Sequence, residues 1–291
     1  MINFLFAGID FLLNENQKVY FLEANSTPGG LKSWKKVYKN LEPLEKLKEI
    51  LKRKNVKTIA ILARGNKERL ETKFHTRKKF LSKFFDVRLC SIEENQKNVK
   101  KNLNLLKDVD GRFFKFDCLH LGNFIKYEPK NVLIINSYKI MKITRDKWKF
   151  YLLLKKKFNL PKTFLIKNEF QAKKIVKKQG WNKFVVKPRY GEKSKGIQIF
   201  EGCEKIKVEK NFLLQEYIEP LKFKQKFWSY RAWVVGYQYT GTLARCSGTS
   251  IVSLSLNAKP AKPPFSIKNQ IRKDCERMIK YLIYSVKKES I

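Results

Sequence analysis

The stretch GIDFLLNENQKVYFLEANSTPGG, residues 8–30, carries three polar residues on two short apolar runs. The runs are joined by the polar turn NENQ, which predicts the two strands of a hairpin. Side chains alternate along a strand, so Glu23 and Asn25 point to one face, and Asp10 can meet them across the hairpin. Two carboxylates and an amide oxygen suit Mg²⁺ when phosphate and water complete its shell. The stretch therefore predicts a metal site, with a polar surface face as the alternative.

The chain has 291 residues, of which 43% are hydrophobic, so it can form two or three packed lobes with a real core. Its five cysteines are scattered and include no C-x-x-C pair, which argues against a zinc site and a disulfide framework. Such cysteine usage is typical of a reducing cytosol, so we expect a cytoplasmic protein. No apolar run reaches the ~20 residues of a membrane helix, and no membrane partner is expected.

The formal net charge is +38, and lysines occur in almost every segment. This excess has two interpretations. It is either a bias towards lysine on solvated faces, or a sign of an acidic partner such as nucleic acid, an acidic protein or polyphosphate. Charge alone does not decide between them.

The segment after residue 56 alternates between apolar runs and a basic helical pattern. We expect strands at 57–63, 86–91 and 131–137, and a helix over 64–84. Such alternation is typical of an α/β unit.

The other segments combine helical spacing with strand-rich runs. Helices are expected over 41–54, 145–158, 169–179 and 266–288. Strands are expected within 3–13, 18–24, 182–190, 211–220, 229–248 and 251–258.

Lys187 ends the apolar strand of FVVKPRYGEKSKG, where a lysine can point into a cleft as a fixed cation for phosphate. The loop that follows offers the backbone N–H groups of Gly191 and Gly196 to a phosphate. The P-loop pattern is absent, and an ordinary basic hairpin is the alternative.

Arg231 and Arg245 interrupt the apolar strands SYRAWVVG and TLARCSG. An arginine on such a strand is either paired in a salt bridge or directed at an anion. Their separation along the chain predicts that they lie on opposite arms of one hairpin.

Together these motifs resemble the ATP-grasp superfamily. The D…E-x-N pattern from Asp10 to Asn25, with N-x-x-P-G after it, is similar to the metal site of that family. FVVKPRYGEKSKGIQIF resembles its lid hairpin, LLQEYIE its hinge, and RDKW with LPKT its passage into the ATP-binding lobe. YRAWVVG…LAR is similar to the branch that contains glutathione synthetase and the glutamate ligases of ribosomal proteins. The lid loop departs from the family, because Glu192, Lys193 and Lys195 stand where small residues are usual.

The resemblance implies an α+β protein with the ATP-grasp fold: an α/β N-lobe, an antiparallel lid domain and a C-terminal antiparallel sheet. It also implies ATP and Mg as cofactors, with a carboxylate substrate that attacks the γ-phosphate and an amine acceptor. Arg245, with Arg231 behind it, is implied to stabilise the transferred group. The residues implied to bind nucleotide are Lys147, Lys187, Gly191, Lys195, Gly196, Gln215, Glu216, Tyr217, Ile218 and Glu219.

In ordinary members of the family the metal motif comes last, after the arginine strands and a helix, whereas here it comes first. We therefore interpret the sequence as a circular permutation. The alternative is the tail of one unit fused to the head of another, in a tandem or mis-split gene. The expected parts are metal-binding strands at 1–40, a connecting helix at 41–56, the α/β lobe at 57–140, the ATP-binding lobe and lid at 141–220, and the arginine strands with the terminal helix at 221–291.

The function that the resemblance implies is an ATP- and Mg-dependent carboxylate–amine ligase that acts through an acyl phosphate. An acidic protein or peptide is one candidate acceptor. Two alternatives remain: a kinase of the same fold, and a basic binder of nucleic acid or acidic polymer that retains the ATP-grasp shell.

Overall fold

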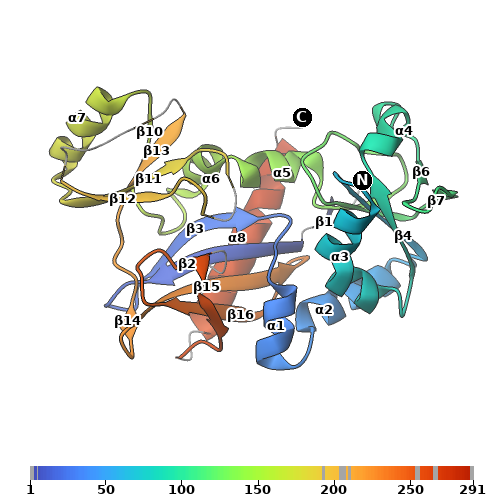
Figure 1. The fold of residues 1–291 in the computed structure, drawn as a ribbon, viewed down its shortest axis with the longest axis horizontal. Coiled ribbons are helices and arrows are strands. Elements are labelled where there is room, and N and C mark those ends of the chain that lie inside the picture. Colours follow the sequence, from blue (N-terminus) through green and yellow to red (C-terminus); the bar gives the residue numbers. More distant parts are fainter. Residues whose placement is uncertain are drawn as a thin grey trace.

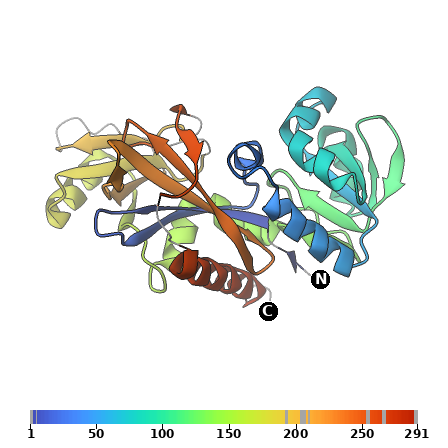
Figure 2. The same ribbon diagram turned by 90° about the horizontal axis from the view of Figure 1, so that it is seen from below.

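The structure is a computed structural model, and it describes residues 3–4, 6–191, 194–202, 208, 211–252, 256–264 and 268–288. Three larger sheets organise this part of the chain, one in each of three lobes (Figure 1). Figure 2 shows the central sheet between the α/β lobe at one end and the lid lobe at the other. The helices and antiparallel sheets give the α+β class that the sequence predicts.

The α/β lobe contains a parallel sheet of order β1-β9-β8-β4-β5. Its strands are β1 (Asn3–Phe4), β4 (Thr58–Ala63), β5 (Asp86–Ser91), β8 (Cys118–Leu121) and β9 (Leu133–Ile135). The other elements are α2 (Glu42–Arg53), α3 (Lys67–Leu81), η1 (Glu93–Asn95), α4 (Gln96–Lys100), β6 (Leu105–Lys107) and β7 (Phe113–Lys115). Strands of this lobe are buried apolar runs, as expected for a parallel sheet covered on both faces.

The lid lobe is an antiparallel sheet of order β10-β13-β11-β12 with one helix. Its elements are β10 (Thr163–Ile166), α7 (Glu169–Gln179), β11 (Lys183–Pro188), β12 (Gln198–Glu201) and β13 (Phe212–Glu216). The predicted hairpin with the GEKSKG tip is the β11–β12 pair, in which Val185 faces Ile199.

The central sheet is antiparallel, in the order β17-β16-β15-β2-β3, and β14 pairs with β15. Its strands are β2 (Phe6–Leu13), β3 (Val19–Asn25), β14 (Lys222–Phe223), β15 (Lys226–Val235), β16 (Gln238–Ser247) and β17 (Lys259–Ala261). The helices around it are α1 (Leu31–Tyr38), α5 (Tyr138–Arg145), α6 (Lys147–Leu154) and α8 (Lys268–Lys288).

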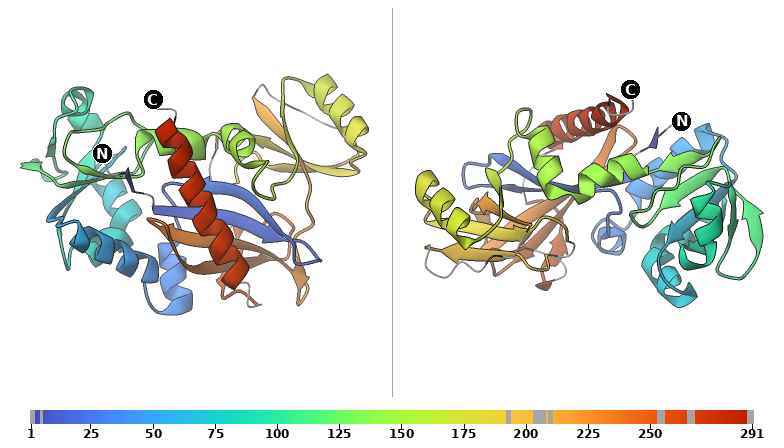
Figure 3. Two further views of the ribbon diagram at one scale, coloured as in Figure 1. Left: turned by 180° about the vertical axis from the view of Figure 1, so that it is seen from behind. Right: turned by 90° about the horizontal axis from the view of Figure 1, so that it is seen from above.

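The two faces of the central sheet differ. One face is covered by α8 (Figure 3), whose apolar stripe includes Ile271, Cys275 and Met278. The opposite face packs at one end against α1, α2 and α3, and at its other end forms the floor of a cleft. Polar side chains can therefore lie on the cleft end of this second face without being covered by a helix.

The first predicted hairpin forms one end of the central sheet, with β3 as its edge strand. β2 pairs with β15 so that Asp10 faces Arg231, and with β3 so that Asp10 also faces Glu23. The interpretation as a circular permutation predicts that residues 3–13 and 18–24 pair in one sheet with residues 230–246. β2 and β3 do so, whereas β1 does not. The permutation also predicts that Met1 and Ile291 lie near each other, but both residues lie outside the described part of the chain.

Several local features differ from the expectations. Helices α1 and α5 are absent from the sequence prediction, because each is a short segment of only eight residues whose stability comes from packing. The strand expected over 251–258 is wrong for the residues described there, since residues 251–252 and 256–258 belong to no strand. β1 joins the parallel sheet of the α/β lobe instead of the central sheet.

In the part of the chain that the structure describes, no helix is long and apolar enough to span a membrane.

Candidate functional site

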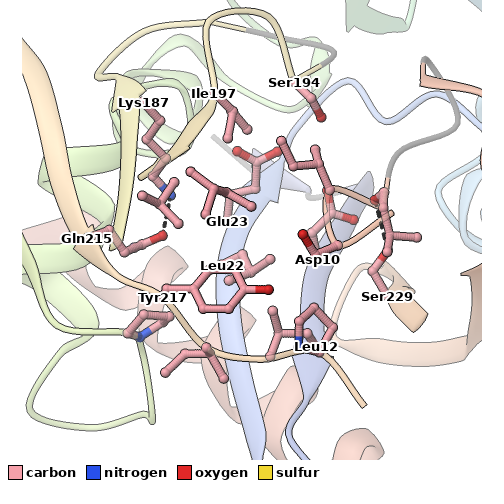
Figure 4. Close-up of a pocket in the computed structure, with 18 of the residues that line it drawn as sticks. Asp10, Leu12, Leu22, Glu23, Lys187, Ser194, Ile197, Gln215, Tyr217 and Ser229 are labelled. Carbon is pink, nitrogen blue, oxygen red and sulfur yellow. Dashed lines mark hydrogen bonds between the residues drawn. The ribbon is translucent and has the colours of Figure 1, made fainter. Parts of the chain in front are cut away.

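A cleft opens where the lid sheet faces the central sheet, and it encloses about 1100 Å³, part of which is open to solvent. Apolar side chains from both sheets, among them Leu12, Val185 and Ile199, form its walls. Figure 4 shows Asp10 and Glu23 on adjacent strands on one side, with Lys187 and Gln215 on the lid side. Apolar walls with a few converging polar groups are typical of a small-molecule site.

The three predicted metal ligands lie together at the floor of this cleft. Asn25 donates from Nδ2 to Oδ2 of Asp10 and to Oε1 of Glu23, each over 3.1 Å. This arrangement follows from the pairing of β2 with β3, which places all three side chains on one face. The structure therefore brings together the residues that the sequence selected.

Two arginines hold Asp10 from the neighbouring strands. Arg231 donates to both of its oxygens, over 2.7 and 2.5 Å, and Arg245 donates to Oδ1 over 3.1 Å. Burial acts to raise the pKa of Asp10, but the charges of the two arginines outweigh it and hold this pKa below its ordinary value. A Cβ on Gly8 would lie 2.9 Å from Cδ of Arg231, so a glycine leaves the path of this side chain open.

The two arginines differ in how many of their N–H donors have a partner. Arg231 gives Nε and Nη2 to Asp10 and Nη1 to the carbonyl of Gly29, so all three of its nitrogens are engaged. Arg245 gives Nη2 to Asp10 and to the carbonyl of Tyr230, while its buried Nε has no partner among the described residues. Arg245 also lines the cleft, whereas Arg231 does not. This geometry suits Arg245 as the arginine that meets an anion, with Arg231 behind it.

Lys187 is 6% exposed and projects from β11 into the cleft, where its Nζ donates to Oε1 of Gln215 over 2.9 Å. Burial lowers the pKa of Lys187 to about 8, with Lys147 acting in the same direction and Glu23 opposing it. No carboxylate lies within salt-bridge distance of this ammonium group in the part of the chain described. A buried cation without an ion-pair partner is well suited to an incoming phosphate.

Lys147 connects the lid to the strands that carry the predicted metal ligands. It begins α6, and its Nζ donates to the carbonyl of Gly191 over 2.7 Å and lies 3.6 Å from Oε2 of Glu23. The residue before it, Asp146, caps α6 and accepts two hydrogen bonds from Arg189, over 2.8 and 2.6 Å. The DK pair of the sequence therefore anchors the base of the lid hairpin next to the predicted metal ligands.

Most of the predicted site residues line the cleft, and the remainder lie beside it. Those that line it are Asp10, Glu23, Lys147, Lys187, Gly191, Lys195, Gln215, Glu216, Tyr217, Ile218 and Arg245. Asn25 and Arg231 contact Asp10 directly. Gly196 and Glu219 are not among the lining residues. A Cβ on Gly196 would lie 2.8 Å from Cγ of Pro188, so this glycine serves the tight turn of the lid.

Sequence reasoning missed several residues of the cleft. Ser194, Ser229 and the segment 250–252 line it, and Thr163 lies behind Gln215 as its hydrogen-bond partner. Thr163 belongs to the quoted LPKT motif, which was a usable signal. The serines carry no pattern of their own, because only the folded sheets bring them to the cleft.

Mg²⁺ fits this donor set on one condition. Each oxygen of Asp10 already accepts two hydrogen bonds, which fills its lone-pair positions. A turn of the Asn25 amide frees one position on Asp10 and presents an amide oxygen beside Glu23. No group of three or more His, Cys, Asp or Glu that could hold a metal occurs among the described residues, so phosphate oxygens and water must complete the shell.

A family model matches the middle of the chain. Residues 144–225 match the model of an ATP-grasp domain, and this segment contains α6, the lid sheet and the hinge after β13. Sequence comparison with curated proteins finds no significant match.

Solved structures extend the likeness over most of the chain. A candidate gamma-glutamylcysteine synthetase from Methylobacillus flagellatus KT is 13% identical, with 97% of this chain and 87% of that chain covered and a TM-score of 0.56. A RimK domain ATP-grasp protein from Sphaerobacter thermophilus DSM 20745 is 16% identical, with 77% and 82% covered and a TM-score of 0.51. The ATP-grasp ligase PsnB, complexed with a phosphomimetic variant of its minimal precursor, Mg and ADP, is 11% identical, with 78% and 81% covered and a TM-score of 0.52.

At these identities the structural likeness establishes the fold alone, and the family model matches residues 144–225. Both agree with the arrangement of the three sheets and the lid. Residues 144–225 therefore match an ATP-grasp domain, and the chain has the ATP-grasp fold.

Proposed function

We propose that this protein is an ATP- and Mg-dependent ligase that joins a carboxylate to an amine through an acyl phosphate. The observation that supports the proposal most is the convergence in one cleft of groups from separate sheets. Asp10, Glu23 and Arg245 come from the central sheet, Lys187 from the lid, and Lys147 from the helix between them. The RimK domain protein and PsnB, both of the same fold, are named as ATP-grasp proteins.

The residues of the cleft have separate roles in binding and chemistry. Lys187 and Lys147 bind the triphosphate from the lid side, and the hinge residues Glu216 to Glu219 hold the adenine and ribose side. Arg245, which has an unpartnered donor, stabilises the charge that develops as a substrate carboxylate attacks the γ-phosphate. An amine then displaces phosphate and forms an amide.

Asp10, Glu23 and Asn25 are the residues that would hold Mg²⁺. When bound, the ion neutralises charge on the β- and γ-phosphates. Arg231 keeps Asp10 ionised and in place, because it donates to both carboxylate oxygens.

The position of these residues in the sequence supports a circular permutation. The pairing of β2 with β15 places β2 and β3 beside the arginine strands. Each ATP-grasp motif named above also occurs once in the sequence. We therefore propose the permuted order over a tandem fusion, with the lobe boundaries at 40, 56, 140 and 220. A structure of an unpermuted relative of higher identity, superimposed strand by strand, would test this order.

The ligase proposal is tested by phosphate release from ATP and Mg²⁺ in the presence of paired carboxylic acids and amines. Release is expected only when both substrates are present. Glu23→Gln should abolish it, while Glu15→Gln, which removes an exposed carboxylate from the turn after β2, should not. Unchanged activity of the Glu23 variant would contradict the metal-site assignment.

The two alternatives give different outcomes in the same experiment. A kinase would phosphorylate one substrate stably, and its turnover would not need an amine. A basic binder would show salt-sensitive binding to nucleic acid or another polyanion, without turnover. The net charge of +38 is the observation that favours this alternative.

A further inference from the structure

Three buried side chains form a chain of hydrogen bonds behind the lid wall of the cleft. Lys187 Nζ donates to Oε1 of Gln215 over 2.9 Å, and Nε2 of Gln215 donates to Oγ1 of Thr163 over 2.7 Å. The hydroxyl of Thr163 then donates to the carbonyl of Pro161 over 2.8 Å. The three side chains are 6%, 7% and 3% exposed, so water does not replace these bonds freely.

The order of donors gives the chain a direction. The single proton of the Thr163 hydroxyl is used by Pro161, so its oxygen can only accept from Gln215. The amide of Gln215 must therefore present its NH₂ group to Thr163 and its oxygen to Lys187. Thr163 and Gln215 are direct partners in the β10–β13 pair, which holds this contact in register.

We propose that Thr163 is a positioning residue for nucleotide binding: it fixes the amide of Gln215 so that the amide oxygen holds the ammonium group of Lys187 at the wall of the cleft. The proposal rests on the proposed binding of ATP in this cleft. Thr163 itself does not line the cleft, so it acts through Gln215.

Loss of the hydroxyl leaves the amide free to turn. A turned amide would place N–H groups against the Lys187 ammonium, where two donors oppose each other in a buried site. The charged groups that face Lys187 are Glu23 on β3 and Lys147 on α6, and the lid strands β10 and β13 face it with the uncharged Thr163 and Gln215. Without the amide oxygen, Lys187 would be held less well and would lose its proton at lower pH.

The test compares Thr163→Val, which removes the hydroxyl at constant size, with Thr163→Ser, which keeps it. Thr163→Val should raise the dissociation constant and KM for ATP with Mg²⁺ about tenfold, with kcat changed less than about threefold, because Lys187 binds ground state and transition state alike. Thr163→Ser should restore values near the unaltered protein. Thr240→Val is the matched control, because it removes another buried hydroxyl that donates to a backbone carbonyl, on β16 and outside the cleft.

A second measurement needs neither ATP nor turnover. Competitive acetylation of the ligand-free protein, read by mass spectrometry, reports the pH at which Lys187 becomes reactive. This pH should be lower in Thr163→Val than in Thr163→Ser and Thr240→Val. If Thr163→Val does not fold, Thr163→Cys, which keeps weak hydrogen bonding, should shift reactivity in the same direction by a smaller amount.

The outcomes separate the two proposals. If the unaltered protein does not bind ATP with Mg²⁺, the proposed function fails, and the acetylation result still decides the role of Thr163. If the unaltered protein binds ATP and Thr163→Val binds it equally well, with Lys187 reactivity unchanged, Thr163 is not a positioning residue.

Discussion

Arginines lie at two places along one face of the central sheet, and they are paired in opposite ways. At the cleft, Arg231 and Arg245 share the carboxylate of Asp10. At the junction with the α/β lobe, Arg77 is 6% exposed and donates from Nη1 to Nε2 of His120 over 2.7 Å. Arg77 forms no ion pair among the described residues. One end of the face therefore has a charge network, and the other has a cation beside a neutral ring.

The surroundings explain how the unpaired cation is tolerated. The guanidinium of Arg77 lies 4.8 Å from the ring centre of Phe6 and 5.7 Å from that of Phe74, both within reach of cation–π attraction. Burial nevertheless lowers the pKa of Arg77 to about 10. Because arginine has no acceptor, His120 must accept at Nε2, which leaves its protonated Nδ1 without a partner. At the cleft, positive and negative side chains compensate one another. At the junction, aromatic rings and a neutral histidine surround a cation that has no carboxylate partner among the described residues.

Removal of Asp10 should give the largest effect. Asp10→Ala leaves the buried Arg245 and the half-buried Arg231 without their carboxylate, and we expect the free energy of unfolding to fall by about 3–5 kcal/mol. Turnover should be lost as well. Urea unfolding measures the first effect and phosphate release the second. Asp110→Asn, which removes an exposed carboxylate, is the control. A stability loss below about 1 kcal/mol would show that the network at the cleft matters no more than a surface pair.

Arg245→Met should mainly affect chemistry, because Asp10 keeps its two bonds from Arg231. We expect kcat to fall by about 10²–10³, the range for removal of a donor that stabilises developing charge. Steady-state kinetics with saturating ATP measure this fall. Arg272→Met on the exposed side of α8 is the control. A rise in KM for ATP with kcat unchanged would place Arg245 in ground-state binding instead.

The two ends of the face should also respond to different pH ranges. Burial and the charge of Arg77 lower the pKa of His120 well below its ordinary value, so the unfolded chain binds a proton below about pH 6.5 that the folded chain does not. Stability should therefore fall as pH drops below 6.5, by about 1.4 kcal/mol per pH unit. The pKa of Asp10 is lowered, so its contribution is present above pH 3.8 and is lost only below that value.

Unfolding at pH 5.5 and 6.5 checks this difference. His120→Gln keeps an acceptor for Arg77 and should reduce the change in unfolding free energy between these two pH values. The same change at the exposed His75 should leave that difference unaltered. A slope that survives in His120→Gln would assign the acid sensitivity to another group.

The smallest effect is expected when both partners at the junction are made apolar. Arg77→Met combined with His120→Leu should change the free energy of unfolding by less than about 1 kcal/mol, since no buried polar group is left unpaired. Urea denaturation provides the measurement. A loss of about 3 kcal/mol or more would mean that the junction pair stabilises the fold as strongly as the network at Asp10.

Much of the site follows from residue types and spacing. The alternation of side chains in E-A-N is a local property of a strand, so the common face of Glu23 and Asn25 was predictable, and the hairpin turn brought Asp10 to them. Lys187 was predictable from its place at the end of an apolar strand. Helices α1 and α5 were not, since packing and not local spacing stabilises them.

The sequence by itself determined the list of groups that we propose to bind a triphosphate and a metal, because those groups and their spacing are properties of individual strands and turns. Only the tertiary structure decided how the groups are shared. Arg231 and Arg245 come from β15 and β16, and their choice between a salt bridge and an anion depended on whether a carboxylate would face them. The contact of β2 with β15 placed Asp10 there, engaged Arg231 fully and left Arg245 with a free donor. The same holds for Thr163, whose role depends on Gln215, 52 residues further along, and local sequence does not specify that partner.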